Sequence, residues 1–151
     1  MKIAFGTDHG GFEYKPALLG RLRWLRHAVQ DMGTFSADPC DYPVIGAQVA
    51  EAVSRGRAAR GVLLCKSGGG MAIMANKFPK VRAVVCQTPE SARHAREHND
   101  ANVLVLGAEG ISEREALVIL SAWLATPFAG GRHARRVRQI RQIERRILKN
   151  N

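Results

Sequence analysis

Short apolar runs alternate with helical patterns along this chain, and the alternation restricts its possible folds more than any other feature. The runs cover residues 2–5, 28–30 (a weaker one), 61–65, 82–86 and 103–106. Such alternation is typical of βαβ units, in which successive strands lie parallel in one sheet. Three of the runs are nearly all apolar, as expected of parallel strands that helices cover on both faces. We therefore expect an α/β fold.

Local signals predict where two of the helices begin. Thr88-Pro89-Glu90 offers an N-cap, a proline in the first turn and an acid near the positive end of the helix dipole. The segment from Ser112 to Glu115 has the pattern of a capping box, and its helix should end before Thr126-Pro127.

The last helical pattern covers residues 133–148 and carries an apolar stripe that needs cover. The stripe consists of Val137, Ile140, Ile143 and Ile147. Either the rest of the same domain or a second subunit could cover it, and the sequence leaves both alternatives open.

The length of 151 residues suits a single domain, residues 1–151, whose core needs no disulfide or structural metal. The 23 Lys and Arg against 13 Asp and Glu give a net charge of +10, which favours an anionic partner. A nucleic acid and a phosphorylated metabolite both fit that charge, so the positions of the charges must decide.

The cysteines Cys40, Cys65 and Cys86 are odd in number and lack Cys-x-x-Cys spacing, so neither a disulfide framework nor a zinc site is indicated. A reducing cytoplasm suits such a chain. The apolar stretch after Met1 stops at Gly6, too short for a signal peptide, and no run is long enough to cross a bilayer. We expect a cytoplasmic protein with no membrane partner.

Reactive groups gather at three strand junctions, where ligands of open parallel sheets commonly bind. The three segments are residues 6–11 after the first strand, residues 65–70 after the third, and His98-Asn99-Asp100 before the last. The glycines Gly68, Gly69 and Gly70 precede a helical pattern over residues 71–77, so their amides could bind an oxyanion. A plain turn is the alternative, and the spacing is not that of a Walker loop.

Cys65 stands at a strand end, before a helix N-terminus and beside Lys66, which predicts a lowered pKa and basic or nucleophilic character. A buried small hydrophobe is the alternative for this residue. Cys86 lies inside an apolar run and has only a structural interpretation, and Cys40 is expected in a loop.

Asp8-His9 could transfer protons, or could be a turn-forming Asp beside an exposed His. His98-Asn99-Asp100 could equally be a helix C-terminus. Arg132 and Arg136 lie one helical turn apart and could bind one phosphate. Further arginines on the same segment are expected on a solvated face; without interleaved aromatics they do not indicate nucleic acid.

Taken together, the motifs resemble the ribose-5-phosphate isomerase B and galactose-6-phosphate isomerase family over roughly residues 1–146. The matching segments are residues 2–6, Asp8-His9-Gly10, Asp41-Tyr42-Pro43, residues 61–70, Ala75-Asn76-Lys77, Arg82-Ala83, residues 96–102, and Gly130-Gly131-Arg132-His133 with Arg136. So many matches in order are specific for the family.

The resemblance implies a Rossmann-like three-layer α/β/α sandwich with a five-stranded parallel sheet. It further implies a homodimer, with tetramers as a possible higher state, whose active sites are shared between subunits and whose C-terminal helix serves dimerisation. Neither cofactor nor metal is implied, and the partner is a small phosphorylated sugar rather than a nucleic acid. The expected reaction converts ribose 5-phosphate to ribulose 5-phosphate through a cis-enediolate; another tetrose, pentose or hexose phosphate, or a noncatalytic sugar-phosphate sensor, is the alternative.

The resemblance also implies a role for each site residue. Cys65 would be the base, with amides around Ser67, Gly68, Gly69 and Gly70 stabilising the enediolate. Asp8 and His98 would assist ring opening, Tyr42 and Asn99 would hold hydroxyls, and His9, Arg132 and Arg136 would bind the phosphate. Independently of the resemblance, Lys66 is also expected to bind the substrate.

Four positions depart from the family pattern. Lys66 stands where glycine is usual, Ser67 replaces a threonine, Gly69 replaces a larger residue, and Glu109 stands where arginine is frequent near the substrate. We hypothesise that Lys66 and Glu109 form a compensating ion pair at the site.

Overall fold

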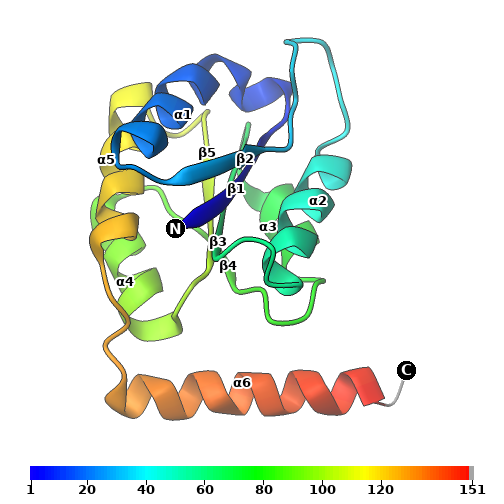
Figure 1. Cartoon of the computed structure of the whole chain (residues 1–151), viewed down its shortest axis with the longest axis vertical. Helices are drawn as coiled ribbons and strands as arrows, with labels where there is room; N and C mark the ends of the chain where they lie inside the picture. Colours follow the sequence, from blue (N-terminus) through cyan, green and yellow to red (C-terminus); the bar gives the residue numbers. More distant parts are fainter. Residues whose placement is uncertain (150–151) are drawn as a thin grey trace.

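The computed structural model describes residues 1–149 as a twisted sheet between two layers of helices (Figure 1). Residues 150–151 of the expected domain lie outside the described part. In chain order the elements are β1 (Lys2–Thr7), η1 (His9–Tyr14), α1 (Lys15–Trp24), β2 (Ala28–Asp31), α2 (Tyr42–Ser54), β3 (Arg60–Cys65), α3 (Gly69–Ala75), β4 (Ala83–Val85), α4 (Pro89–Asn99), β5 (Val103–Gly107), α5 (Glu113–Ala125) and α6 (Gly131–Lys149).

The five strands pair in the order β2-β1-β3-β5-β4, and every pair is parallel, which confirms the predicted fold class. From β1 the chain continues to β2 on one side, whereas β3 lies on the other side. The strand order therefore reverses between β1 and β3. In open α/β sheets a crevice forms beyond the carboxyl ends of the strands at such a reversal.

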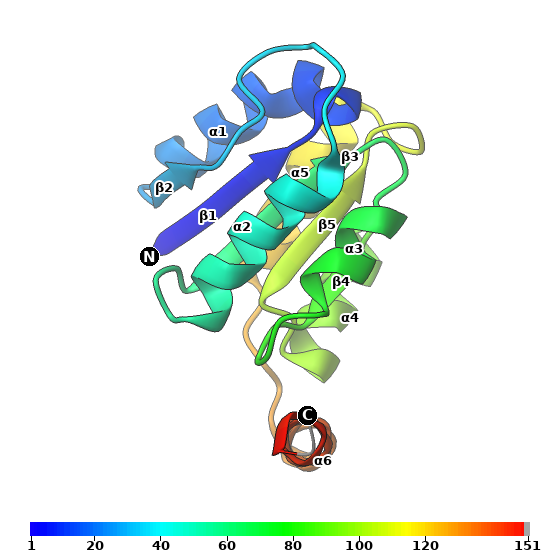
Figure 2. The same ribbon diagram turned by 90° about the vertical axis from the view of Figure 1, so that its right-hand side faces the viewer.

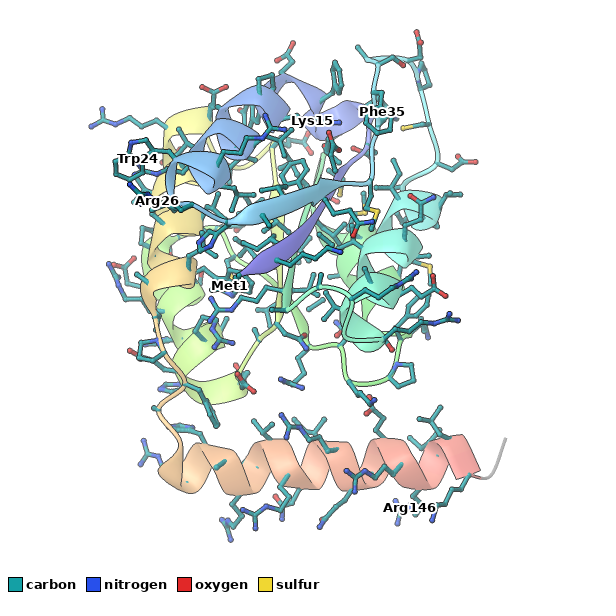
Figure 3. The ribbon with its side chains drawn as sticks, in the orientation of Figure 1. Met1, Lys15, Trp24, Arg26, Phe35 and Arg146 are labelled. Carbon is teal, nitrogen blue, oxygen red and sulfur yellow. The ribbon has the colours of Figure 1, made fainter. Side chains whose placement is uncertain are left out.

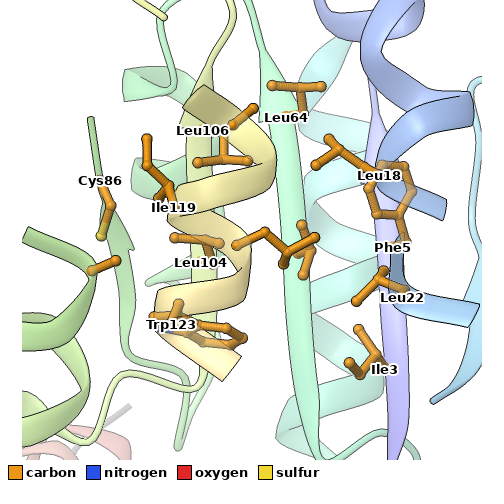
Figure 4. Close-up of a cluster of buried hydrophobic side chains, with 14 of the residues drawn as sticks. Ile3, Phe5, Leu18, Leu22, Leu64, Cys86, Leu104, Leu106, Ile119 and Trp123 are labelled. Carbon is orange, nitrogen blue, oxygen red and sulfur yellow. The ribbon is translucent and has the colours of Figure 1, made fainter. Parts of the chain in front are cut away.

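Successive strand residues face opposite layers, as the pleat requires. Ile3 and Phe5 join the core beneath α1, α4 and α5, which also contains Leu104 and Trp123 (Figure 4). Ala4 points to the other face, where it joins Leu63 of β3 and Val105 of β5 in a second core beneath α2 and α3. Figure 2 shows the two helical layers on either side of the sheet.

Both predicted helix starts are confirmed. The Thr88 hydroxyl accepts the Ser91 N–H at 3.1 Å, and the Ser112 hydroxyl accepts the Glu115 N–H at 3.3 Å. The Glu115 carboxylate accepts the Ser112 N–H in return at 2.7 Å, which completes the capping box. The helix ends at Ala125, as predicted.

Several element boundaries differ from the predicted ones by one or two residues, and side-chain hydrogen bonds account for two of these differences. Arg82 lies outside β4 because its N–H donates to the Asn102 side chain at 2.7 Å instead of to a neighbouring strand. The helix expected from residue 71 already begins at Gly69 and ends at Ala75, since the Asn76 side chain turns to bind the Ala83 backbone at 2.8 and 2.9 Å.

Helix α6 lies across the amino ends of the strands, set apart from the sandwich (Figures 1 and 2). Of its apolar stripe, only Val137 is buried, whereas Ile140, Ile143 and Ile147 are each about half exposed (51%, 49% and 54%). They border an open groove that Phe78 and Pro79 line on the other side. The protomer thus covers only the beginning of the stripe. No helix within residues 1–149 combines the length and apolarity that crossing a membrane requires.

Candidate active site

Asp8 and Cys65 meet at the reversal between β1 and β3. Asp8 follows β1 and is 6% exposed; its carboxylate accepts the Gly10 N–H at 2.9 Å and caps η1. Cys65 is the last residue of β3 and is close enough for the Asp8 charge to act on its thiol. Two of the predicted junctions are therefore brought together.

A ring of backbone amides surrounds the Cys65 thiol. The sulfur accepts the Gly68 N–H at 3.1 Å, and the amides of Ser67 and Met71 also hydrogen-bond to it. Gly68 has φ of +85°, a left-handed conformation that favours glycine. The glycine loop thus curls around the sulfur before α3 begins.

The predicted lowering of the Cys65 pKa is wrong. The structure raises this pKa above its ordinary value, because burial disfavours the thiolate and the Asp8 charge adds to that effect. The surrounding amides oppose the rise without cancelling it. Lys66, which was expected to lower the pKa, extends its side chain into solvent.

Tyr42 opens α2 against the glycine loop. A Cβ added to Gly70 would lie 2.4 Å from the Tyr42 ring carbon Cζ, so the ring rests directly on the Gly70 backbone. The 41% exposure of Tyr42 leaves part of the side chain accessible to a ligand.

His9 is held by the loop that precedes α2. Its Nδ1 accepts the Cys40 N–H at 3.1 Å, so the neutral ring carries its proton on Nε2, where it can donate to an anion. The Cys40 sulfur lies 3.9 Å from the same nitrogen. The sequence identified Cys40 only as a loop thiol, and no local pattern signals this contact.

Lys15 ties the same loop to the sheet. Its buried ammonium binds the Asp31 carboxylate at 3.0 Å, donates to the Thr34 carbonyl and lies 4.4 Å from the centre of the Phe35 ring (Figure 3). A buried charge persists only when it is paired and hydrogen-bonded, as here. Lys15 therefore anchors the loop whose Cys40 N–H binds His9.

Lys66 and Glu109 form the hypothesised ion pair. Lys66 Nζ lies 3.9 Å from Glu109 Oε1, and the two side chains are 74% and 63% exposed. Both line a pocket of about 520 Å³ that also contains His9. An ion pair this exposed contributes at most about 1 kcal/mol to the free energy of unfolding.

Gly107, which sequence analysis did not single out as a site residue, supports the glycine loop from behind. A Cβ at this position would lie 2.6 Å from the Ser67 carbonyl oxygen and 2.7 Å from its carbon. The end of β5 therefore fixes the Ser67–Gly68 backbone by close packing, a contact between distant segments that only the fold shows.

The third predicted junction lies at the opposite edge of the sheet. Helix α4 runs back from the carboxyl ends of the strands, so His98 and Asn99, at its end, lie at the amino edge with the start of β5. Within one protomer they therefore do not lie beside Cys65, because the connection that precedes a parallel strand reaches the other edge. The helix C-terminus interpretation is confirmed, with Asp100 as a left-handed cap at φ 48°.

The amino-edge group includes the two predicted phosphate arginines. The His98 ring stacks on His133 of α6 at 4.2 Å between centroids and lies 5.0 Å from His94. Burial, His98 and then the nearby Arg132 and Arg136 lower the pKa of His133, which favours its neutral ring. Arg132 and Arg136 themselves are exposed.

His133 and His94 were not among the predicted site residues. The spacing of four between His94 and His98 could have placed both on one helix face. The stacking partner His133 comes from another helix and has no such local signal.

Asp100 anchors this edge. Its carboxylate binds Arg82 at 2.9 Å, Arg96 at 3.0 Å and Arg141 of α6 at 3.5 Å. These pairs join the α4–β5 turn to the last helix and fix the backbone that presents His98 and Asn99.

Known proteins resemble this chain in sequence and in fold. A family model described as Ribose/Galactose Isomerase matches residues 3–140. The chain belongs to this family. Ribose-5-phosphate isomerase B of Escherichia coli (strain K12) is 46% identical to it over 145 residues, which are 96% of this chain and 97% of that relative.

Two solved structures of the family have nearly the same fold. Ribose-5-phosphate isomerase B of Clostridium thermocellum superposes with a TM-score of 0.94 at 45% identity, over 97% of this chain and 99% of that one. The Mycoplasma genitalium enzyme, solved with bound ribulose-5-phosphate, gives 0.92 at 32% identity, over 95% and 96%. Within residues 1–149, no three His, Cys, Asp or Glu side chains gather in a way that could hold a metal ion.

Proposed function

We propose that this protein interconverts ribose 5-phosphate and ribulose 5-phosphate. The names of its relatives support this substrate, and one observation in the chain itself supports the chemistry. A thiol ringed by backbone amides stands beside a buried carboxylate at the strand-order reversal. That combination provides a base next to donors for a developing oxyanion.

In the proposed reaction, the Cys65 thiolate removes the proton from C2 of the open-chain aldose. The C–H electron pair forms the C1–C2 double bond of a cis-enediolate, and the carbonyl π pair moves to O1. The O2–H proton then moves to O1, which leaves the negative charge on O2. The Cys65 thiol returns its proton to C1 while O2 becomes the carbonyl, which yields the ketose and regenerates the thiolate. The amides of Gly69 and Gly70, in the first turn of α3, would donate to the enediolate oxygen.

The remaining predicted residues bind and open the sugar in this proposal. Asp8 and His98 assist ring opening, and Tyr42 and Asn99 hold hydroxyls. His9 binds the phosphate together with Arg132 and Arg136, which orients the sugar from a point remote from the reacting carbons.

The same proposal requires two protomers. Cys65 and Asp8 lie at the carboxyl edge, whereas His98 and the arginines lie at the amino edge, so one protomer holds only half of the set. The half-exposed isoleucines of α6 and the groove beside them offer an apolar surface for a second copy. We assign α6 to that interface, and the three free cysteines suit a cytoplasmic location.

Proton NMR with four substrates tests the function. Ribose 5-phosphate, allose 6-phosphate, galactose 6-phosphate and erythrose 4-phosphate are supplied separately in D₂O, and ketose formation and exchange at C2 are followed. Conversion of ribose 5-phosphate is expected. Conversion of another sugar alone would reassign the substrate, and binding without exchange would indicate a sensor.

The activity should rise with pH well into the alkaline range. Because burial and the Asp8 charge raise the pKa of the Cys65 thiol above its ordinary value, most of the thiol is protonated at neutral pH and only the small thiolate fraction can act as base. Below that pKa, kcat/KM should increase about tenfold per pH unit. Initial rates between pH 6 and pH 10, at constant ionic strength, check this; a plateau from pH 7 upward would contradict it.

Gly107→Ala should lower kcat by about 100-fold, the effect of losing an oxyanion donor. The added methyl meets the Ser67 backbone, which has no flexible end to move aside, so the glycine loop must shift. The control is Gly20→Ala on α1, where no atom beyond the neighbouring residues and backbone of the same helix lies within 4 Å of the new Cβ. That variant should keep full activity and gain up to about 1 kcal/mol in unfolding free energy. A kcat of Gly107→Ala within threefold of wild type would remove the loop from the mechanism.

A further inference from the structure

Lys66 is the permanent positive charge of the pocket beside His9. Among the described residues that line this pocket, Lys66 alone carries such a charge, while Glu13 and Glu109 are acidic. Arg132 and Arg136 belong to α6 at the other edge of the sheet. In a single protomer an incoming anion therefore meets one lysine and two carboxylates.

The main chain builds the Lys66–Glu109 pair. Strands β3 and β5 end their pairing at Cys65 and Gly107, and just beyond them the Glu109 N–H donates to the Lys66 carbonyl at 2.9 Å. The two side chains thus leave from hydrogen-bonded residues close to the candidate base. A Cβ on Gly10 would lie 3.0 Å from the Lys66 Cβ, so the lysine also starts beside the residue that follows His9.

The pair is poorly suited to a purely structural role. Its 3.9 Å separation and high exposure make it weak and open to exchange with other ions. A phosphate dianion, with more charge and more acceptor oxygens than one carboxylate, can compete for the same ammonium. Glu109 is then left to repel the anion unless Lys66 has moved between them.

We propose that Lys66 binds the phosphate of the substrate in the pocket beside His9, and that Glu109 is a positioning residue that holds Lys66 at the pocket mouth until the phosphate displaces it. This proposal deepens the proposed function and rests on it for the identity of the sugar phosphate. It makes the pair a determinant of phosphate affinity rather than of the chemical step.

Phosphate binding measured without turnover tests the proposal. Inorganic phosphate is titrated by ³¹P NMR into wild type, Lys66→Met, Glu109→Gln and the double variant, at one low ionic strength. Lys66→Met should weaken binding about tenfold, as expected for loss of one charge-assisted hydrogen bond at a solvated site. Glu109→Gln should tighten it about threefold, since the freed ammonium has no competitor.

The double variant separates the role of Glu109 from simple repulsion. If Glu109 acts through Lys66, most of the tightening by Glu109→Gln is lost when Lys66 is already Met, and only the relief of simple repulsion remains. If Glu109→Gln tightened phosphate binding equally in wild type and in Lys66→Met, the positioning role of Glu109 would be overturned. Weaker phosphate binding by the single variant Glu109→Gln would overturn it as well. The control Lys2→Met removes the same charge from the exposed start of β1 at the amino edge and should leave phosphate affinity unchanged.

Steady-state kinetics then distinguish this proposal from the proposed function. With ribose 5-phosphate, Lys66→Met should raise KM about tenfold with kcat within about twofold of wild type. If the wild type turns over normally, and Lys66→Met changes neither KM nor phosphate affinity, this inference alone is overturned. Absence of turnover in wild type, with the phosphate pattern as expected, would overturn the proposed function alone.

Discussion

Cys65→Ala is expected to lower kcat for ribose 5-phosphate by about 10³-fold or more, since a general base alone contributes about 10² to 10⁴. The thiol is the ionisable group that the amides of Ser67, Gly68 and Met71 surround, and alanine removes it with a small change in volume. Exchange of the C2 proton in D₂O should disappear together with ketose formation. Circular dichroism and urea unfolding verify that the variant remains folded.

Two cysteine variants make this result specific. Cys65→Ser keeps a polar atom beside the same amides, but a hydroxyl ionises far less readily than a thiol, so this variant should be nearly as inactive as Cys65→Ala. Cys40→Ala removes the loop thiol while its N–H still binds His9, and its activity should stay within a few-fold of wild type. If Cys65→Ala retained a tenth of wild-type activity, the base would be another group.

Sequence-local signals predicted most of the fold. The apolar runs at β3 and β5 needed helices on both faces, and the capping residues Thr88 and Ser112 fixed two helix starts to the residue. These features depend on neighbours within a few positions in the chain. The boundary at Arg82 was missed because its backbone partner, Asn102, is twenty residues away.

The site was less predictable, because its chemistry depends on packing. The pKa of Cys65 follows from burial and from the Asp8 charge, both of which arise only when β1 and β3 lie side by side. The contacts of Gly107 and of Cys40 likewise join segments far apart in sequence. The Lys66–Glu109 pair was predictable because the two departures from the family pattern carry opposite charges.

Mixing two inactive variants should restore activity if the site is shared between protomers. Cys65→Ala disables the carboxyl-edge half, and the double variant Arg132→Met with Arg136→Met disables the amino-edge half without touching buried residues. Each alone should lose at least about 100-fold in kcat/KM. A mixed dimer then contains one site with both halves intact, so random pairing should return about a quarter of wild-type activity.

A second mixture of variants distinguishes an active site shared between protomers from any other effect of mixing. Cys65 and His9 both lie at the carboxyl edge of the same protomer, so a dimer of Cys65→Ala with His9→Asn contains no intact site. Refolding that mixture should restore nothing, whereas the first mixture recovers. Recovery in neither mixture, with mixed dimers verified by mass, would place the whole site within one protomer. The two edges of the sheet would then have to meet by a rearrangement of α6, because α6 carries both arginines and contacts α4 at the amino edge.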